Sequence, residues 1–287
     1  MFFVKKRKKE SVAIPFLISM LVALVFIGIP ASKVYQSLIH TKNENESKNN
    51  LEEYAPNSKN NTTVLVVFDV DDDELRDTFM VFRTYATNRR FVSVPISNEL
   101  LYNTDLSSTR MDDIYKKGGI LELKDAVSKT LDIKIDRYLK LNNETFTLLC
   151  DVLGGVNINV PSGLRGLNEG TQNLSSEFII KFLSNKKFSE PDRTEATGNL
   201  VSEMLIQTTG NRVASALDYT FEKLVNSSTE TDITAIDYND QKKALEYMLT
   251  NNQFEATYIN PSTEAENNGI KLTSTSKKEI KELCGIK

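Results

Sequence analysis

TVLVVFD, at Thr63–Asp69, is a short apolar run rich in β-branched residues, and it predicts a buried strand. TFMVFR at Thr78–Arg83 and FVSVP at Phe91–Pro95 predict two more strands. Asp69 leaves the end of the first strand, and Asp77 opens the second. If these strands pair in order, the two carboxylates meet at one edge of the sheet. A rigid edge beside loops is a common place for a metal-dependent phosphate site.

Helical and strand patterns alternate after Pro95. The expected elements are a helix around Leu123–Leu131, a strand within Ile133–Leu141, a helix capped by Asn142 or Asn143 and stopped by Gly154-Gly155, and a strand over Val156–Val160. The order helix, glycine stop, strand is typical of an α/β protein. We therefore predict one α/β domain over residues 62–260.

The last third of the chain is predicted to be mostly helical. The expected elements are helices over Leu174–Leu183, Asp192–Gln207 and Val213–Val225, a weak strand over Thr231–Ile236, a helix capped by Asn239, and an edge strand over Phe254–Ile259. Residues 261–287 are polar and are predicted to form a tail with one short helix at most.

The N-terminus predicts where the domain lies. Five cations at Lys5–Lys9 precede an apolar run from Val12 to Ile29, about the minimum length that spans a bilayer. Cations on that side place residues 1–10 in the cytoplasm, 11–31 in the membrane as one retained helix, and 32–61 outside as a flexible stalk. The alternative is a signal peptide cleaved near Pro30–Ser32. We expect a single-pass protein of the cell membrane with its domain extracytoplasmic.

Composition excludes several classes of function. The chain carries 35 basic and 39 acidic residues, and removing residues 1–10 leaves 30 basic and 38 acidic, a net charge of −8. Such a domain is a poor partner for nucleic acid, which is bound by basic surfaces. The one histidine, His40, lies in the stalk, and two cysteines are too few for a zinc site. Whether Cys150 and Cys284 pair is left open.

Five sequence pieces, in the same order, resemble the LytR–CpsA–Psr family, membrane-anchored proteins mainly of Gram-positive bacteria. They are Val67–Asp69 for the family's glycine-x-Asp, Leu75–Thr78 for R-S-D-T, Ser93–Ser97 for S-I-P-R-D, Arg110 through Tyr115 to Gly118-Gly119 for K-I-N…Y…GG, and Ile135–Pro161 for I-D-x-Y through D-x-x-GGV-x-V-x-V-P. The last match is long and specific. The resemblance covers roughly Val64–Arg212 and, more weakly, the segment to Ile259.

The resemblance implies a single mixed central sheet flanked by helices, preceded by a transmembrane helix. It implies transfer of a glycopolymer from a polyprenyl diphosphate lipid to the cell-wall polymer, with the lipid tail in an apolar pocket. Asp69 and Asp77 match the family's metal ligands, and the implied cofactor is Mg²⁺. Guanidinium groups neutralise the remaining charge of the diphosphate.

The family's arginines are only partly present. Arg193 matches the arginine of D-x-G-R, and with Arg76 it is the candidate catalytic cation; Arg110 and Lys186 are candidate substrate-binding residues. The arginine after S-I-P is replaced by Ile96, which cannot bind an anion.

Two interpretations therefore stay open: a weak or altered Mg²⁺-dependent phosphotransferase, or a non-catalytic binding or scaffolding protein of the envelope. We expect transferase activity to be reduced or lost.

Overall fold

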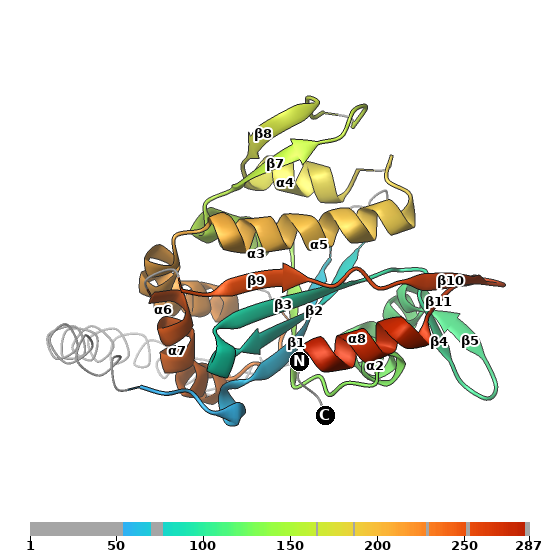
Figure 1. The fold of residues 1–287 in the computed structure, drawn as a ribbon, viewed down its shortest axis with the longest axis horizontal. Coiled ribbons are helices and arrows are strands. Elements are labelled where there is room, and N and C mark those ends of the chain that lie inside the picture. Colours follow the sequence, from blue (N-terminus) through green and yellow to red (C-terminus); the bar gives the residue numbers. More distant parts are fainter. Residues whose placement is uncertain are drawn as a thin grey trace, which may run out of the picture. The chain divides into compact units, whose positions relative to one another are not determined.

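The computed structural model describes residues 54–69, 77–164, 166–185, 187–227, 230–250 and 253–284. Residues 55–287 form one compact unit around a five-stranded sheet of order β6-β1-β2-β3-β9 (Figure 1). The sheet's strands are β1 (Thr62–Phe68), β2 (Thr78–Tyr85), β3 (Arg90–Ile96), β6 (Arg137–Leu141) and β9 (Glu255–Tyr258). Pairs β1·β2 and β2·β3 are antiparallel, whereas β1·β6 and β3·β9 are parallel. The predicted mixed α/β sheet is confirmed.

Three two-stranded sheets lie outside the central one. They pair β4 (Leu101–Asn103) with β5 (Ser108–Arg110), β7 (Val156–Val160) with β8 (Gly170–Leu174), and β10 (Thr263–Glu266) with β11 (Gly269–Leu272). The helices are α2 (Met111–Leu131), α3 (Asn143–Leu153), α4 (Ser176–Leu183), α5 (Glu190–Gln207), α6 (Gly210–Asn226), α7 (Ala235–Leu249) and α8 (Ser274–Leu283), with 3₁₀ turns η1 (Ser58–Asn60) and η2 (Ala86–Asn88).

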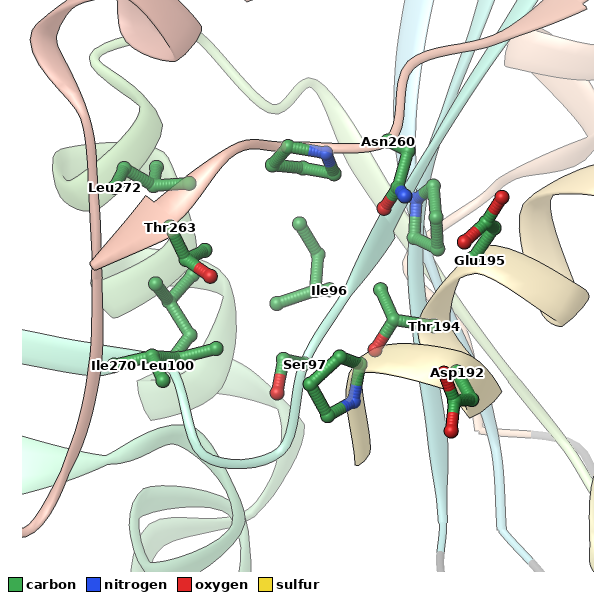
Figure 2. Close-up of a pocket in the computed structure, with 13 residues that line it drawn as sticks. Ile96, Ser97, Leu100, Asp192, Thr194, Glu195, Asn260, Thr263, Ile270 and Leu272 are labelled. Atoms are coloured by element: carbon green, nitrogen blue, oxygen red, sulfur yellow. The ribbon is translucent and has the colours of Figure 1, made fainter. Parts of the chain in front are cut away.

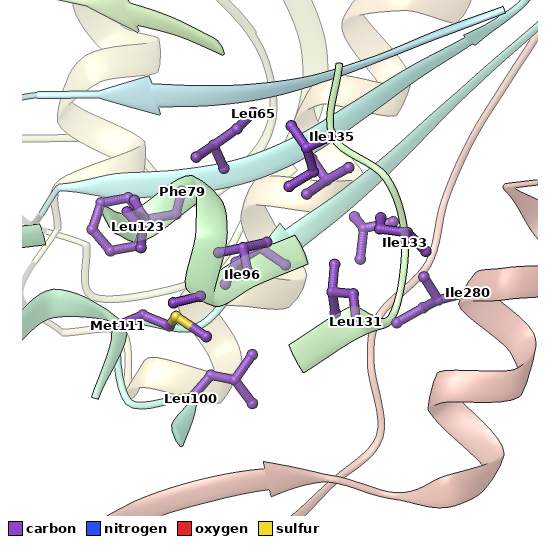
Figure 3. Close-up of a cluster of buried hydrophobic side chains, with 14 of the residues drawn as sticks. Leu65, Phe79, Ile96, Leu100, Met111, Leu123, Leu131, Ile133, Ile135 and Ile280 are labelled. Carbon is purple, nitrogen blue, oxygen red and sulfur yellow. The ribbon is translucent and has the colours of Figure 1, made fainter. Parts of the chain in front are cut away.

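One face of the sheet is packed into a dense core. Leu65 of β1 and Phe79 of β2 contact the apolar side of α2, and Ile280 of α8 closes the far side of the cluster (Figure 3). Alternation along the strands explains this, because every second side chain points to the same face. Gly119 interrupts α2 with φ 69° and ψ −165°, a conformation that glycine adopts without steric cost.

The opposite face is covered by other helices. Figure 1 shows α3 and α5 on the side of the sheet away from α2 and α8. A second core cluster joins these helices to α4 and the β7·β8 pair, and it contains Cys150, Phe182 and Leu200. Cys150 and Cys284 are both buried as free thiols, in different clusters.

Three predictions about the last third are wrong. Residues 263–284 do not form a polar tail: β10, β11 and α8 are ordered elements, and the apolar side chains of α8 enter the main core. The cap of α7 is Thr234, whose side chain accepts a hydrogen bond from the Asp237 N–H, so Asn239 lies inside the helix. The weak strand at 231–236 is reduced to one bridge between Thr231 and Leu139.

Several predicted features fall outside the described residues. These are the cytoplasmic tail at 1–10, the transmembrane segment at 11–31 and most of the stalk, together with Arg76 and Lys186. Among the helices that the structure does describe, none combines the length and apolar character needed to span a bilayer.

Candidate functional site

Two carboxylates meet at one end of the central sheet. The antiparallel register pairs Phe68 with Thr78, so the next residue outward on each strand is an aspartate, Asp69 and Asp77. Their side chains lie within hydrogen-bonding reach of each other. The predicted juxtaposition is therefore present in the structure. Two carboxylates this close repel one another unless a proton or a cation is shared between them.

A lysine and a tyrosine hold Asp69. Lys140 Nζ lies 2.6 Å from Asp69 Oδ2, and the Tyr115 hydroxyl donates to the same oxygen at 2.9 Å. Lys140 reaches this place because β6 runs parallel to β1 with Val67 opposite Lys140. Burial works to raise the pKa of Asp69, but the hydrogen bonds from Lys140 and Tyr115 outweigh it and hold that pKa below its usual value.

The pKa values of the two donors, Tyr115 and Lys140, shift in the opposite direction. Burial and the bond to Asp69 raise the pKa of the Tyr115 phenol, so the hydroxyl stays protonated and keeps donating. The hydrogen bond to Asp69 raises the pKa of Lys140, so its ammonium stays charged. Lys140 thus brings a permanent cation to the pair of carboxylates.

Arg193 lies at the site, but its charge is already neutralised by an ion pair with Glu190. Its Nη1 donates to the Asp77 carbonyl at 3.3 Å and to the Thr78 hydroxyl at 3.2 Å. Its Nη2 and Nε donate to the two oxygens of Glu190 at 3.0 and 3.2 Å. Arg193 and Glu190 are only 6% and 4% exposed. Glu190 lies one helical turn before Arg193 on α5, and the two side chains form a buried ion pair.

Asn98 carries a buried oxygen with no hydrogen-bond partner. Its N–H donates to Glu190 at 2.8 Å, and its side-chain Nδ2 donates to the Asp77 carbonyl at 3.0 Å. Its Oδ1 is buried and unpaired. Native proteins rarely leave such an atom unsatisfied, so this position fits a water or ligand group beside Asp77.

The remaining candidate cations are not assembled around the carboxylates in the described part of the chain. Arg110 forms hydrogen bonds with Asp112 at 3.0 and 3.1 Å and lies 3.8 Å from Glu99, at the start of α2. Arg76 and Lys186 belong to the residues outside the description, so their role as site residues stays a prediction.

Ile96 lines a cleft of about 200 Å³ next to α5, whose lining is part apolar and part polar. Figure 2 shows its side chain between Leu100, Ile270 and Leu272 on one side and Thr194 on the other. This is the position at which the resembling family has an arginine. The hydrocarbon neighbours explain how the cleft accommodates isoleucine.

A larger cavity, of about 580 Å³, lies against the other end of the sheet. Its apolar lining comes from β1, α6, α7 and the segment between those two helices. It includes Val64, Leu217, Phe221, Leu224, Ile233 and Leu245. Leu224 also belongs to an apolar cluster with Phe68, Leu141 and Phe146 that leads towards the Asp69 end of β1. The rings of Phe68 and Phe146 stack 4.1 Å apart within that cluster. The cavity itself does not include either carboxylate.

The wall of this cavity is held by an ion pair. Arg137 Nε and Nη2 donate to the two oxygens of Asp237 at 3.0 and 2.5 Å, which ties β6 to the first turn of α7. Arg137 is the main reason that the pKa of Asp237 lies far below its ordinary value. A carboxylate with a depressed folded-state pKa stabilises the protein above its unfolded pKa of about 4, and this stabilisation is lost as the pH falls towards the folded value.

We therefore expect Asp237→Asn to lower stability at pH 7 and to make the loss of stability between about pH 5 and 2 shallower. Urea unfolding of both proteins at several pH values measures this. Asp125→Asn is the matched control, because Asp125 forms an exposed ion pair with Lys129 at 2.6 Å. Equal acid sensitivity of wild type and Asp237→Asn would contradict the assignment.

The oxygen atoms around Asp69 and Asp77 match what Mg²⁺ binds. Mg²⁺ is typically held by one or two carboxylates, with waters and substrate phosphates completing its shell. The described residues contain no cluster of three or more His, Cys, Asp or Glu side chains that would enclose a metal without substrate.

Sequence reasoning missed Lys140, Glu190 and Asn98. Lys140 had a usable signal, because it is a cation flanked by Leu139 and Leu141 at the end of the predicted strand. Glu190 lies three residues before Arg193, a helical spacing that permits pairing. Asn98 had no signal, since its position depends on how the loop after β3 packs against α5.

The fold is one already seen in solved structures. A putative transcription regulator from Eubacterium siraeum superimposes with a TM-score of 0.72 at 21% identity, over 81% of this chain and 94% of that chain. TagT bound to LIIa-WTA gives a TM-score of 0.59 at 15% identity, over 79% and 91%. These similarities define the class as an α/β domain of this shared architecture.

The sequence then gives the family. The profile of the LytR_cpsA_psr family matches residues 29–285, and the chain belongs to this family. The polyisoprenyl-teichoic acid–peptidoglycan teichoic acid transferase TagU of Bacillus subtilis (strain 168) is 31% identical over 122 residues. That alignment covers 40% of this chain and 39% of TagU, so the chain spans about two-fifths of the curated relative's length.

Proposed function

We propose that this protein binds a polyprenyl-diphosphate-linked glycopolymer in the cell envelope and transfers it slowly to the cell-wall polymer. The observation that carries the proposal is the meeting of Asp69 and Asp77 at the sheet edge, with Asn98 beside them. Family membership and the similarity to a teichoic acid transferase support it.

The reaction is a phosphoryl transfer between oxygen atoms. A hydroxyl of the wall polymer attacks the phosphorus that carries the glycan, and a new P–O bond forms. The anhydride P–O bond breaks, polyprenyl monophosphate leaves with the bonding electron pair, and the hydroxyl proton passes to a base. Negative charge grows on the departing phosphate, so cations beside it lower the barrier.

Asp69 and Asp77 would hold a divalent cation, and Mg²⁺ fits their oxygen ligands. When bound, Mg²⁺ would neutralise the diphosphate oxygens and stabilise the developing charge. The chain's own contribution is to fix the Asp69 carboxylate, through Tyr115 and Lys140, and the backbone that carries Asp77. Arg193 and Asn98 hold the Asp77 backbone through its carbonyl oxygen.

The 580 Å³ cavity is our candidate for the polyprenyl tail. A hydrocarbon chain entering it would run along the apolar cluster between Leu224 and Phe146 to place its diphosphate near Asp69. Each buried methylene contributes about 0.8 kcal/mol, so even partial occupation supports tight binding.

Thr220→Trp, which fills this cavity from α6, is expected to weaken binding of a fluorescent polyprenyl diphosphate about tenfold or more, the effect of two methylenes excluded. Tyr219→Trp is the control. Tyr219 is adjacent to Thr220 in the sequence, but it is 54% exposed and does not line the cavity. Unchanged affinity in Thr220→Trp would place the tail elsewhere.

Two observations favour a non-catalytic envelope-binding protein as the second candidate. Glu190 neutralises the charge of Arg193, and Ile96 stands where the family pattern has a second arginine. Release of polyprenyl monophosphate by the full-length chain, followed with and without Mg²⁺, separates the two. Release that needs both Mg²⁺ and Asp77 supports the slow transferase, whereas binding without any release supports the binding protein.

We also propose that residues 11–31 anchor the chain in the cell membrane with the domain outside. The apolar run and the preceding cations support this. Protease added to intact cells should remove the domain and leave a protected N-terminal fragment, and a resistant domain would contradict the orientation.

A further inference from the structure

We propose that Lys140 takes two positions, bonding Asp69 when the metal is absent and turning to the substrate's diphosphate when a divalent cation binds the carboxylates. The inference rests on the proposed function, because it concerns the same site. It assigns a binding role to a residue that the arginine pattern of the family does not include.

The first argument is competition for one oxygen. Asp69 Oδ2 already accepts from Lys140 Nζ at 2.6 Å and from the Tyr115 hydroxyl at 2.9 Å. A divalent ion that ligates this carboxylate would lie next to the ammonium, and two cations at such a separation repel strongly. Lys140 therefore has to move away from Asp69 when a metal ion takes its place.

The second argument is freedom to move. The side chain of Lys140 is 31% exposed, and its ammonium lies 5.9 Å from the centroid of the Tyr115 ring. Lysine carries its charge on a flexible four-carbon stem with three rotatable donors. The strand fixes the Lys140 backbone through the pairing with Val67, so only the stem has to turn.

The third argument is the charge that a diphosphate needs. Arg193 is bonded to Glu190 inside the protein, and Arg110 is bonded to Asp112. Lys140 is bonded to a group that the metal would claim, so its charge becomes available at the moment of metal binding. Its ammonium then supplies a cation to a site from which the family's arginine after S-I-P, here Ile96, is missing.

The test measures metal binding and diphosphate binding separately, on the full-length chain. Free Mn²⁺ is followed by electron paramagnetic resonance during titration of wild type, Lys140→Met and Lys140→Gln. We expect both variants to bind Mn²⁺ about tenfold more tightly or better, because a competing cation is gone. At saturating Mn²⁺, we expect their affinity for farnesyl diphosphate to fall about tenfold or more.

Lys124→Met is the matched control. Lys124 forms a comparable ion pair with Asp232 at 3.0 Å, and it lies 5.5 Å from the Tyr138 ring centroid, but it does not bond Asp69. It should leave both affinities unchanged. Thermal unfolding of every variant confirms that the proteins compared are folded, and the glutamine variant retains a hydrogen-bonding side chain if methionine prevents folding.

The outcomes separate this inference from the function on which it rests. If wild type binds no Mn²⁺, or if Asp77→Asn binds it equally well, the metal site of the proposed function fails. If wild type binds Mn²⁺ through Asp77 but the Lys140 variants bind it no more tightly, the two-position role is overturned and the metal site stands. Tighter Mn²⁺ binding with unchanged diphosphate affinity would also overturn it.

Discussion

Replacing Glu190 with alanine is expected to lower the free energy of unfolding by about 3–5 kcal/mol, the usual cost of leaving a buried charge without its partner. Arg193 is 6% exposed, and its Nη2 and Nε both donate to Glu190. The same glutamate accepts the N–H of Asn98 at 2.8 Å, so the change also frees the loop after β3. Urea unfolding followed by circular dichroism measures the loss.

Two further proteins sharpen this experiment. Glu177→Ala breaks an exposed pair with Lys181 on α4, where the glutamate is 71% exposed, and it should cost less than about 1 kcal/mol. The double change Glu190→Ala with Arg193→Met removes both charges and should recover part of the lost stability. A single-variant cost near that of Glu177→Ala would mean that the pair is hydrated and not buried.

Asp77→Asn is expected to reduce Mg²⁺-dependent release of polyprenyl monophosphate by about 10²–10³-fold, the size of effect seen when one preorganised electrostatic group is removed. The amide keeps the shape of the side chain but loses the charge that the proposed metal needs. Because an amide can still donate a hydrogen bond to Asp69, stability should stay about equal.

Asp105→Asn serves as the control for this loss, since Asp105 is exposed in the turn between β4 and β5. Rates are compared at matched protein concentration, with the melting temperature of each variant recorded. Full activity in Asp77→Asn would remove this carboxylate from the reaction, and a lowered melting temperature would assign the effect to folding.

The local pattern of the strands was enough to predict the centre of the fold. The β-branched runs at β1, β2 and β3 and the caps at Asn142 and Gly154 depend on neighbouring residues, and the structure confirms them. The meeting of Asp69 and Asp77 also followed, because hairpin register is set by adjacent strands.

Long-range packing was not predictable in the same way. Ile280 appears in a polar segment, and only its contact with the core formed by α2 makes it a buried residue. The β7·β8 pair shows the expected alternation of Val156, Ile158 and Val160, but the pattern does not say that this strand pairs outside the central sheet. Similarly, Arg193 had acids on both sides, and tertiary burial selected Glu190.

The docking of α8 has a consequence for how the polypeptide matures. Ile280 and Cys284 seal the hydrophobic layer beneath the sheet, while β9, beside β3, comes from residues 255–258. A chain from which residues 255–284 have not yet emerged would therefore leave both an open sheet edge and uncovered apolar surface, which invite aggregation.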